Sequence, residues 1–139
     1  MSNMKVYFDL SDELEMLLSD NKLSISSILQ LKNVDCDVNY GEMPLLSQQT
    51  VQNRDLLPFF TSVEDALTAL IAFWQTFKAI ETFIHVKVEE CCLTRTPPCK
   101  VIYECQEIDS SKFKTILKKD IGLDECVFII RISIRSLKF

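Results

Sequence analysis

The stretch over residues 61–90 places the strongest constraint on what this chain can fold into. It begins with a helical apolar period and then changes to the period of two that is typical of a half-buried strand. Ser62 with Asp65, or Thr61 with Glu64 one residue earlier, has the spacing of a capping box and predicts where the helix begins. The chain is therefore expected to place a long buried helix directly before a strand.

The predicted helix has a broad apolar face, formed by Val63, Ala66, Leu67, Ala69, Leu70, Phe73, Trp74, Phe77 and Ile80. This face is wider than the seam of a coiled coil, which indicates a helix packed on a core. We expect most of the face to pack on the sheet of the same domain and its margin to contact a partner. Phe73 and Trp74 are therefore candidate partner-binding residues.

The composition predicts one globular domain over residues 1–139, because 47% of the residues are hydrophobic and 25% are charged. The two glycines, Gly41 and Gly122, are isolated, which excludes glycine-rich phosphate loops. The net charge of −5 argues against nucleic-acid binding. No apolar run is long enough to span a membrane, and the first residues lack the pattern of a signal peptide. We therefore expect an intracellular protein whose six cysteines are reduced.

Apolar periods and turn residues predict the remaining elements. Strands are expected over Met4–Leu10, Val34–Tyr40, Ile84–Leu93, Cys99–Gln106 and Cys126–Arg135, helices after Ser11 and Asp109 and over Ser24–Lys32, and a long loop over residues 45–60. This order predicts an α+β domain with a mostly antiparallel sheet of about five strands and helices mainly on one face. Its last part, from the core helix onward, has much of the order of a split βαβ unit.

The last predicted strand is apolar on both faces except at Arg131 and Ser133. A strand of this kind needs cover on both faces and is an aggregation hazard at an exposed edge. Either it lies centrally in the sheet or it pairs across a subunit interface. A homodimer is therefore one expectation from the sequence.

Cys91, Cys92, Cys99 and Cys105 lie close together, but their spacing differs from that of a zinc knuckle or ribbon. Adjacent cysteines on a strand point to opposite faces, so Cys91 and Cys92 are not expected to share a metal ion. A hairpin would still bring one of them near Cys99. We interpret these thiols as small buried hydrophobes and expect no metal and no cofactor.

His85 is the single histidine, and nothing in its spacing pairs it with Cys92, Cys99 or a serine as a nucleophile and base. The sequence therefore predicts no catalytic residues and a protein that is not an enzyme.

Charge is distributed unevenly along the chain. Residues 1–110 carry 8 basic and 17 acidic side chains, a net charge of −9, whereas residues 111–139 carry 7 basic and 3 acidic side chains, a net charge of +4. The basic end suggests a surface for an acidic protein partner or a second copy, with candidate residues Lys112, Lys118, Lys119, Arg131 and Arg135. The alternative is that this end packs beside the acidic helix near Asp12 within one molecule.

The opening MKVYFDLSDELEMLL and the helix-to-hairpin run over residues 63–107 resemble, in element order and apolar pattern, a small adenovirus early-region-4 protein family. Members of that family oligomerise to capture host nuclear factors, so the resemblance implies a viral accessory assembly protein. It leaves residues 45–55 and the C-terminal helix and strand uncovered.

The leading functional prediction is a non-enzymatic interaction or assembly module that acts through homo- or hetero-oligomerisation. The viral accessory role is one alternative. A regulatory domain that binds a small ligand between the core helix and the sheet is another. Neither a membrane nor a nucleic acid is expected as a partner.

Overall fold

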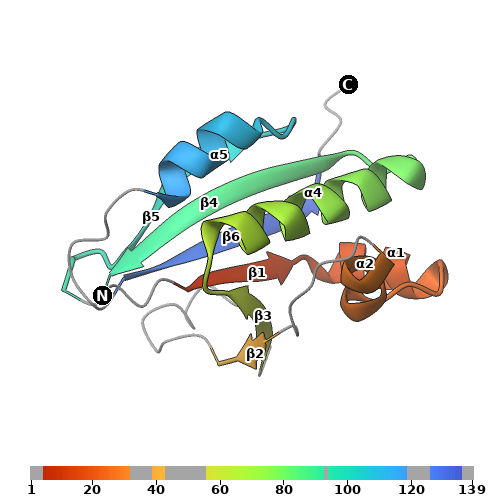
Figure 1. The fold of residues 1–139 in the computed structure, drawn as a ribbon, viewed down its shortest axis with the longest axis horizontal. Coiled ribbons are helices and arrows are strands. Elements are labelled where there is room, and N and C mark those ends of the chain that lie inside the picture. Colours follow the sequence, from red (N-terminus) through yellow and green to blue (C-terminus); the bar gives the residue numbers. More distant parts are fainter. Residues whose placement is uncertain (1–4, 32–38, 43–55, 93, 119–125, 136–139) are drawn as a thin grey trace.

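The structure is a computed structural model that describes residues 5–31, 39–42, 56–92, 94–118 and 126–135. These residues form six strands and four helices (Figure 1). In chain order they are β1 (Val6–Leu10), α1 (Asp12–Asp20), α2 (Ile25–Leu31), β2 (Asn39–Gly41), β3 (Leu57–Phe60), α4 (Val63–Ala79), β4 (Ile84–Cys92), β5 (Cys99–Cys105), α5 (Ser110–Leu117) and β6 (Cys126–Ile134). The predicted α+β class is confirmed, with one strand more than expected.

All six strands form one sheet in the order β2-β3-β1-β6-β4-β5. The pairing of β1 with β6 is parallel, and every other pairing is antiparallel. The last strand therefore lies centrally, between β1 and β4, which decides between the two positions that its apolar sequence allowed.

The second half of the chain contains the split βαβ unit that the element order predicted. Both β5 and β6 run antiparallel to β4 and flank it, so they are parallel to each other. Because α5 connects them, the unit consists of two parallel strands and a helix with a third strand inserted between the two.

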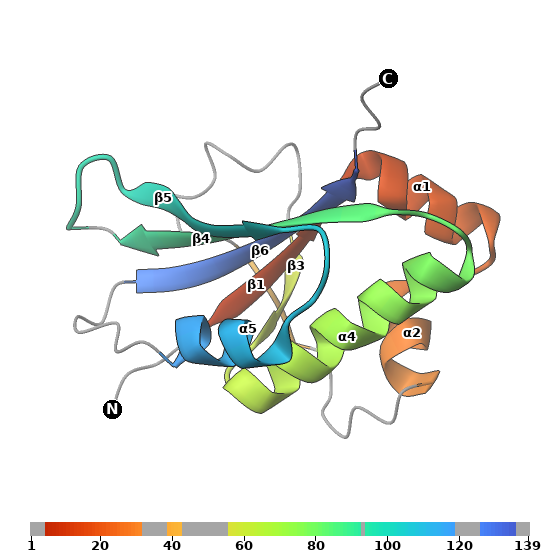
Figure 2. The same cartoon turned by 90° about the horizontal axis from the view of Figure 1, so that it is seen from above.

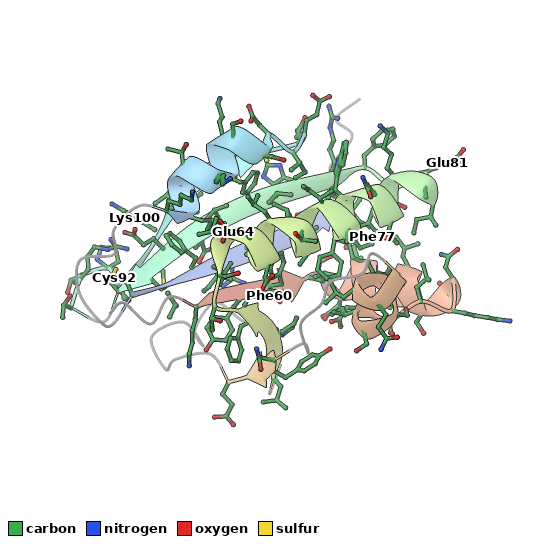
Figure 3. The ribbon with its side chains drawn as sticks, viewed as in Figure 1. Phe60, Glu64, Phe77, Glu81, Cys92 and Lys100 are labelled. Atoms are coloured by element: carbon green, nitrogen blue, oxygen red, sulfur yellow. A yellow bond between two sulfur atoms is a disulfide. The ribbon has the colours of Figure 1, made fainter. Side chains whose placement is uncertain are left out.

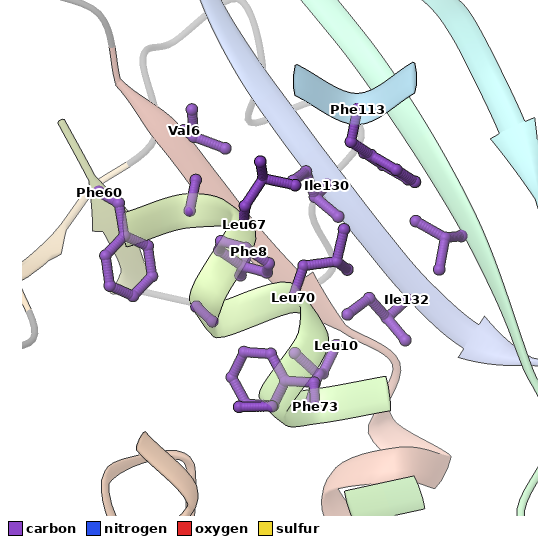
Figure 4. Packing of buried hydrophobic residues seen from close by; sticks show 14 of the residues in the cluster. Val6, Phe8, Leu10, Phe60, Leu67, Leu70, Phe73, Phe113, Ile130 and Ile132 are labelled. Carbon is purple, nitrogen blue, oxygen red and sulfur yellow. The ribbon is translucent and has the colours of Figure 1, made fainter. Parts of the chain in front are cut away.

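The main core lies between one face of the sheet and the helices α4 and α5. Figure 4 shows Leu67, Leu70 and Phe73 of α4 beside Phe8 of β1 and Ile130 of β6, and all five are buried in one cluster. Phe113 brings α5 into the same cluster through an edge-to-face contact with Tyr103 of β5, at 5.3 Å between ring centroids. Side chains therefore fill the space between α4 and the sheet.

The start of α4 follows the predicted capping pattern. Of the two candidate caps, Ser62 is the one used, and its Oγ accepts a hydrogen bond of 3.1 Å from the backbone N–H of Asp65. The residues that the helix buries include seven of the nine on the predicted apolar face: Val63, Ala66, Leu67, Ala69, Leu70, Phe73 and Phe77. None of the described helices combines the length and the apolarity needed to cross a membrane.

The end of α4 comes earlier than the apolar pattern suggests. The backbone of Glu81 has a φ of 57°, and its N–H donates to the carbonyl of Lys78 at 3.0 Å. The N–H of Thr82 donates to the carbonyl of Phe77 at 2.8 Å, which completes a Schellman motif. The same arrangement ends α1 at Lys22, so in both helices a charged residue takes the left-handed position that glycine usually fills.

The prediction of a loop over residues 45–60 is wrong for its last part, because residues 57–60 form β3. Phe59 pairs with Tyr7 and Phe60 pairs with Val6, so β3 extends the sheet next to β1. A segment of four residues that contains Pro58 has too little period to show a strand, and only the pairing partners reveal it. Residues 45–55 of the predicted loop, and residues 34–38 of the strand predicted before it, lie outside the described residues.

Candidate functional site

The sheet face that points away from α4 carries a group of partly buried charges. Asp9 on β1 lies opposite Arg131 on β6, and Glu89 on β4 lies next to them on the same face. The Nη1 of Arg131 donates to Oδ2 of Asp9, and its Nε donates to Oε1 of Glu89 at 2.9 Å. The side chain of Arg131 is 17% exposed, and those of Asp9 and Glu89 are 13% exposed. One guanidinium thus joins two carboxylates across three adjacent strands.

Beside this group, four cysteines form two disulfides that connect β4 to its neighbours. Cys91 is bonded to Cys99 of β5, and Cys92 is bonded to Cys126 of β6, each pair directly opposite in the register. The expectation that all six cysteines are reduced is therefore wrong for these four. That expectation rests on the predicted intracellular location alone, whereas the register places these cysteines directly opposite each other.

The adjacent cysteines Cys91 and Cys92 belong to opposite faces of the sheet, as the alternation of strand side chains predicted. Cys91 is buried in a second apolar cluster on the face away from α4, with Tyr7, Leu57, Val127 and Ile129. The expected meeting of a hairpin pair of cysteines is also found, because β4 and β5 bring Cys91 and Cys99 together.

Glu89 connects the charged group to the first disulfide. A carboxylate oxygen of Glu89 and the Sγ atoms of Cys91 and Cys99 all lie within 4.8 Å of one another. The Oε2 of Glu89 is buried and has no hydrogen-bond partner among the described residues. Thiolates and carboxylates are metal ligands, but the disulfide between Cys91 and Cys99 leaves the carboxylate as the one ionised ligand of this group.

The structure gives no support to a cysteine nucleophile activated by His85. Both Cys92 and Cys99 are in disulfides, so neither carries a free thiol. His85 lies near the opposite end of β4, roughly 20 Å from Cys92 at the usual rise of a strand. Its Nε2 is 3.2 Å from Oε1 of Glu104, to which Lys87 also lies close.

Cys105 is the one free cysteine among the described residues. Burial raises the pKa of its thiol to about 11, although a hydrogen bond with Tyr103 acts in the opposite direction. The thiol is therefore protonated at neutral pH, which makes it a poor nucleophile.

The candidate partner-binding residues fall into different environments. Phe73 is fully buried in the main core and faces the sheet, whereas Trp74 at the margin of α4 is half-buried, with Nζ of Lys78 5.0 Å from its ring centroid. Arg131 belongs to the charged group described above. Arg135 is partly buried, and its backbone N–H donates to the carbonyl of Phe83 at 2.9 Å.

The basic residues of α5 lie on the surface. Lys112, Lys114 and Lys118 are exposed, and none of them forms an ion pair with another described residue. Phe113 and Leu117 anchor the helix, because both are buried in the main core. Lys119, the other lysine predicted for this surface, lies outside the described residues.

The acidic helix α1 lies far from α5 in both views of the fold (Figures 1 and 2). Its first turn carries Asp12, Glu13 and Glu15. The alternative in which the basic end packs beside this acidic helix within one molecule therefore does not hold for α5. It holds for β6, which contacts α1 and whose Ile132 carbonyl accepts a hydrogen bond of 2.9 Å from the backbone N–H of Ser11.

A shallow hollow of about 310 Å³ lies between α1, the start of α2 and β2. Its lining combines apolar and polar side chains, namely Glu15, Leu18, Leu23, Ser24, Ile25, Ser26 and Tyr40. The small-ligand hypothesis placed its pocket between the core helix and the sheet, where the structure has close-packed side chains instead (Figure 4).

Comparisons with known proteins identify no relative. No protein-family model matches the chain, and neither a curated protein nor a solved structure is significantly similar to it. The resemblance in element order to the adenovirus early-region-4 family stays a prediction.

Proposed function

We propose that this chain is a non-enzymatic interaction module that assembles with copies of itself or with an acidic surface of another protein. The observation that carries the proposal is the set of exposed lysines on α5 and at its C-cap, Lys112, Lys114 and Lys118, without an acidic partner among the described residues. Because α5 is packed on the core through its buried side chains, its lysines offer a fixed basic surface for an acidic partner.

The separation of charge within the fold supports self-association in particular. The acidic first turn of α1 and the basic α5 lie at different ends of the molecule (Figure 2). A contact between the α5 of one copy and the α1 of another would join two different surfaces, and contacts of that kind build rings or filaments.

The strand next to α5 supplies a second feature that suits association. Among the described strands β5 pairs only with β4, so its outer edge lies at the border of the sheet, with Val101 47% exposed. The backbone groups on such an edge can pair with a strand of another chain. Lys100 lies on β5, and Figure 3 shows it at the same end of the sheet as Cys92. An acidic strand is therefore the kind of partner that this region suits.

The test reverses the charge of the basic surface in the full chain with the double variant Lys112→Glu/Lys118→Glu. We expect the wild type to give masses above that of the monomer by light scattering after size exclusion, and higher salt to reduce them. The double variant is expected to weaken association about tenfold or more, because two attractive pairs become repulsive.

The matched control is Lys87→Glu, which changes an exposed lysine of β4 on the sheet face that points away from α4. It should leave the mass unchanged. A wild type that stays monomeric at high concentration and binds no acidic peptide, or a double variant that assembles like the wild type, contradicts the proposal.

The hollow near Tyr40 favours a second candidate function, the binding of a small polar ligand. A thermal-shift screen of metabolites should then find one whose stabilising effect is lost in Ser26→Ala, whose hydroxyl contacts the hydroxyl of Tyr40 at 3.3 Å. A screen without a stabilising compound, or an effect that survives in Ser26→Ala, contradicts this second function.

A further inference from the structure

We propose that reduction of the Cys91–Cys99 disulfide converts this corner of the sheet into a Zn²⁺ site formed by the two thiolates and the carboxylate of Glu89. The site is independent of the α5 surface, since it lies on the face of the sheet that points away from α4 and α5.

The register of the hairpin already places the three ligands together. Cys91 and Cys99 are directly opposite on neighbouring strands, with 4.0 Å between their Cα atoms, and Glu89 precedes Cys91 by two residues on the same face. Their donor atoms lie within 4.8 Å of one another. In a tetrahedral zinc site with Zn–S distances of about 2.3 Å, two ligand atoms are roughly 3.8 Å apart. After reduction, rotation of the two cysteine side chains is enough to reach this spacing.

One carboxylate oxygen of Glu89 accepts a hydrogen bond from a described residue, and the other accepts none. Arg131 donates to Oε1 of Glu89, and Asp9 binds the same guanidinium from the other side. Oε2 is buried and has no hydrogen-bond partner among the described residues, which is an unfavourable state for a carboxylate oxygen. A metal ion at the thiolates would give this oxygen a ligand bond, and the Asp9–Arg131 pair would orient the carboxylate from the second shell.

The types of the ligand atoms determine which metal ion the site prefers. Two thiolates favour Zn²⁺ over Mg²⁺ or Ca²⁺, which bind oxygen ligands. With one carboxylate the site supplies three protein ligands, and a water molecule completes the tetrahedron.

The conversion balances with a phosphine as the reductant. Phosphine, water and the disulfide give phosphine oxide and two thiols, so the phosphorus loses two electrons and the S–S bond is broken. Zn²⁺ then displaces one proton from each thiol to the solvent as the two Zn–S bonds form. A disulfide oxidant reverses the process, taking two electrons from the thiolates and releasing Zn²⁺.

The second disulfide serves as an internal control. Cys92 and Cys126 are also directly opposite on neighbouring strands. Among the described residues, however, no carboxylate or imidazole forms a comparable group with them, and the nearby Glu90 is bound by Arg95. Reduction of this pair therefore gives two thiols without a third ligand.

The experiment uses the full chain, reduced with a phosphine, desalted without oxygen and titrated with Zn²⁺ against a chromophoric chelator. Co²⁺ in place of Zn²⁺ reports the ligands through thiolate-to-metal charge transfer and tetrahedral d–d bands. We expect one ion per chain in the reduced protein, none in the oxidised protein, and a thiolate signal in the Co²⁺ spectrum.

The variants separate this site from adventitious binding by thiols. Cys99→Ser should abolish stoichiometric binding, and Glu89→Gln, which keeps the size of the side chain, should weaken it about tenfold or more. The double variant Cys92→Ala/Cys126→Ala should bind as the wild type does. Circular dichroism of every reduced variant identifies those that keep the fold, and only these are compared.

Three outcomes would overturn the proposal. The first is a folded, reduced protein that binds no ion. The second is an affinity that Glu89→Gln leaves unchanged. The third is binding that survives in Cys99→Ser and is lost in the variant without Cys92 and Cys126.

Discussion

Among single residues, Arg95 makes the densest set of contacts in the hairpin between β4 and β5. Its Nη1 donates to Oε1 of Glu90 at 2.6 Å, and its Nη2 donates to the carbonyls of Glu90 and Pro98 at 2.6 and 3.1 Å. The side chain of Glu90 is 9% exposed, so its charge needs a partner. Arg95 therefore fixes the hairpin loop and neutralises the one buried acidic residue of the described core.

We expect Arg95→Ala to lower the free energy of unfolding by about 3 kcal/mol, because it leaves the carboxylate of Glu90 buried without a counter-charge. Arg95→Lys should recover only part of this loss, since an ammonium group cannot reproduce the planar set of donors. Urea unfolding of the oxidised protein measures both effects. Lys100→Ala, an exposed neighbour on β5, is the control and should change stability by less than about 0.5 kcal/mol. Equal effects of Arg95→Ala and Lys100→Ala would contradict this assignment.

The contacts within the charged group could not be predicted from the sequence. Arg131 is predicted as a partner-binding residue because it belongs to the basic end of the chain, yet it binds Asp9 from a position 122 residues away. No local pattern connects two residues so far apart, and the contact appears only once β1 and β6 are known to be neighbours. The same holds for Cys92 and Cys126, which only the register of β4 and β6 brings together.

Among the elements, α4 shows which sequence signals are sufficient to predict a helix. Its start, to within one residue, and its apolar face could be predicted, because both depend on residues within a few turns of one another. The hairpin strands could be predicted for the same reason, since β4 alternates over Ile84–Cys92. β3 could not, because its four residues become a strand only through pairing on both sides.

The C-terminal end of α4 offers a test of the left-handed position at Glu81. A side chain at a φ of 57° is strained, and glycine relieves that strain but has more conformational freedom to lose on folding. We expect Glu81→Gly to be more stable than Glu81→Ala by about 0.5–1 kcal/mol. Thermal unfolding of the two variants measures the difference. Equal stability would show that the Schellman motif does not hold this residue in solution.

At the scale of the whole molecule, the two disulfides tie the middle of the sheet to one edge. The Cys92–Cys126 bond closes a segment with a sequence separation of 34, whereas the Cys91–Cys99 bond closes one of only 8. A longer loop loses more freedom in the unfolded chain when it is closed. The two bonds are therefore expected to differ in their effect on stability.

We expect Cys92→Ala/Cys126→Ala to be less stable than Cys91→Ala/Cys99→Ala by about 1.2 kcal/mol, because loop closure contributes about 3.8 and about 2.6 kcal/mol respectively. Denaturant unfolding of both variants without reductant gives the comparison. The opposite order would show that packing around the sulfur atoms, and not loop closure, sets their contribution.

The parallel pairing of β1 and β6 has a consequence for how the protein is made. The ribosome synthesises β1 first among the described strands and β6 last, yet the two are neighbours in the middle of the sheet. Until β6 emerges, the edges of β1 and β4 that will bind it stay unpaired, and the apolar residues of α4 lack part of their cover. The sheet therefore cannot close until the last strand has been synthesised. During that interval the nascent chain needs protection from aggregation, as chaperones provide for other chains.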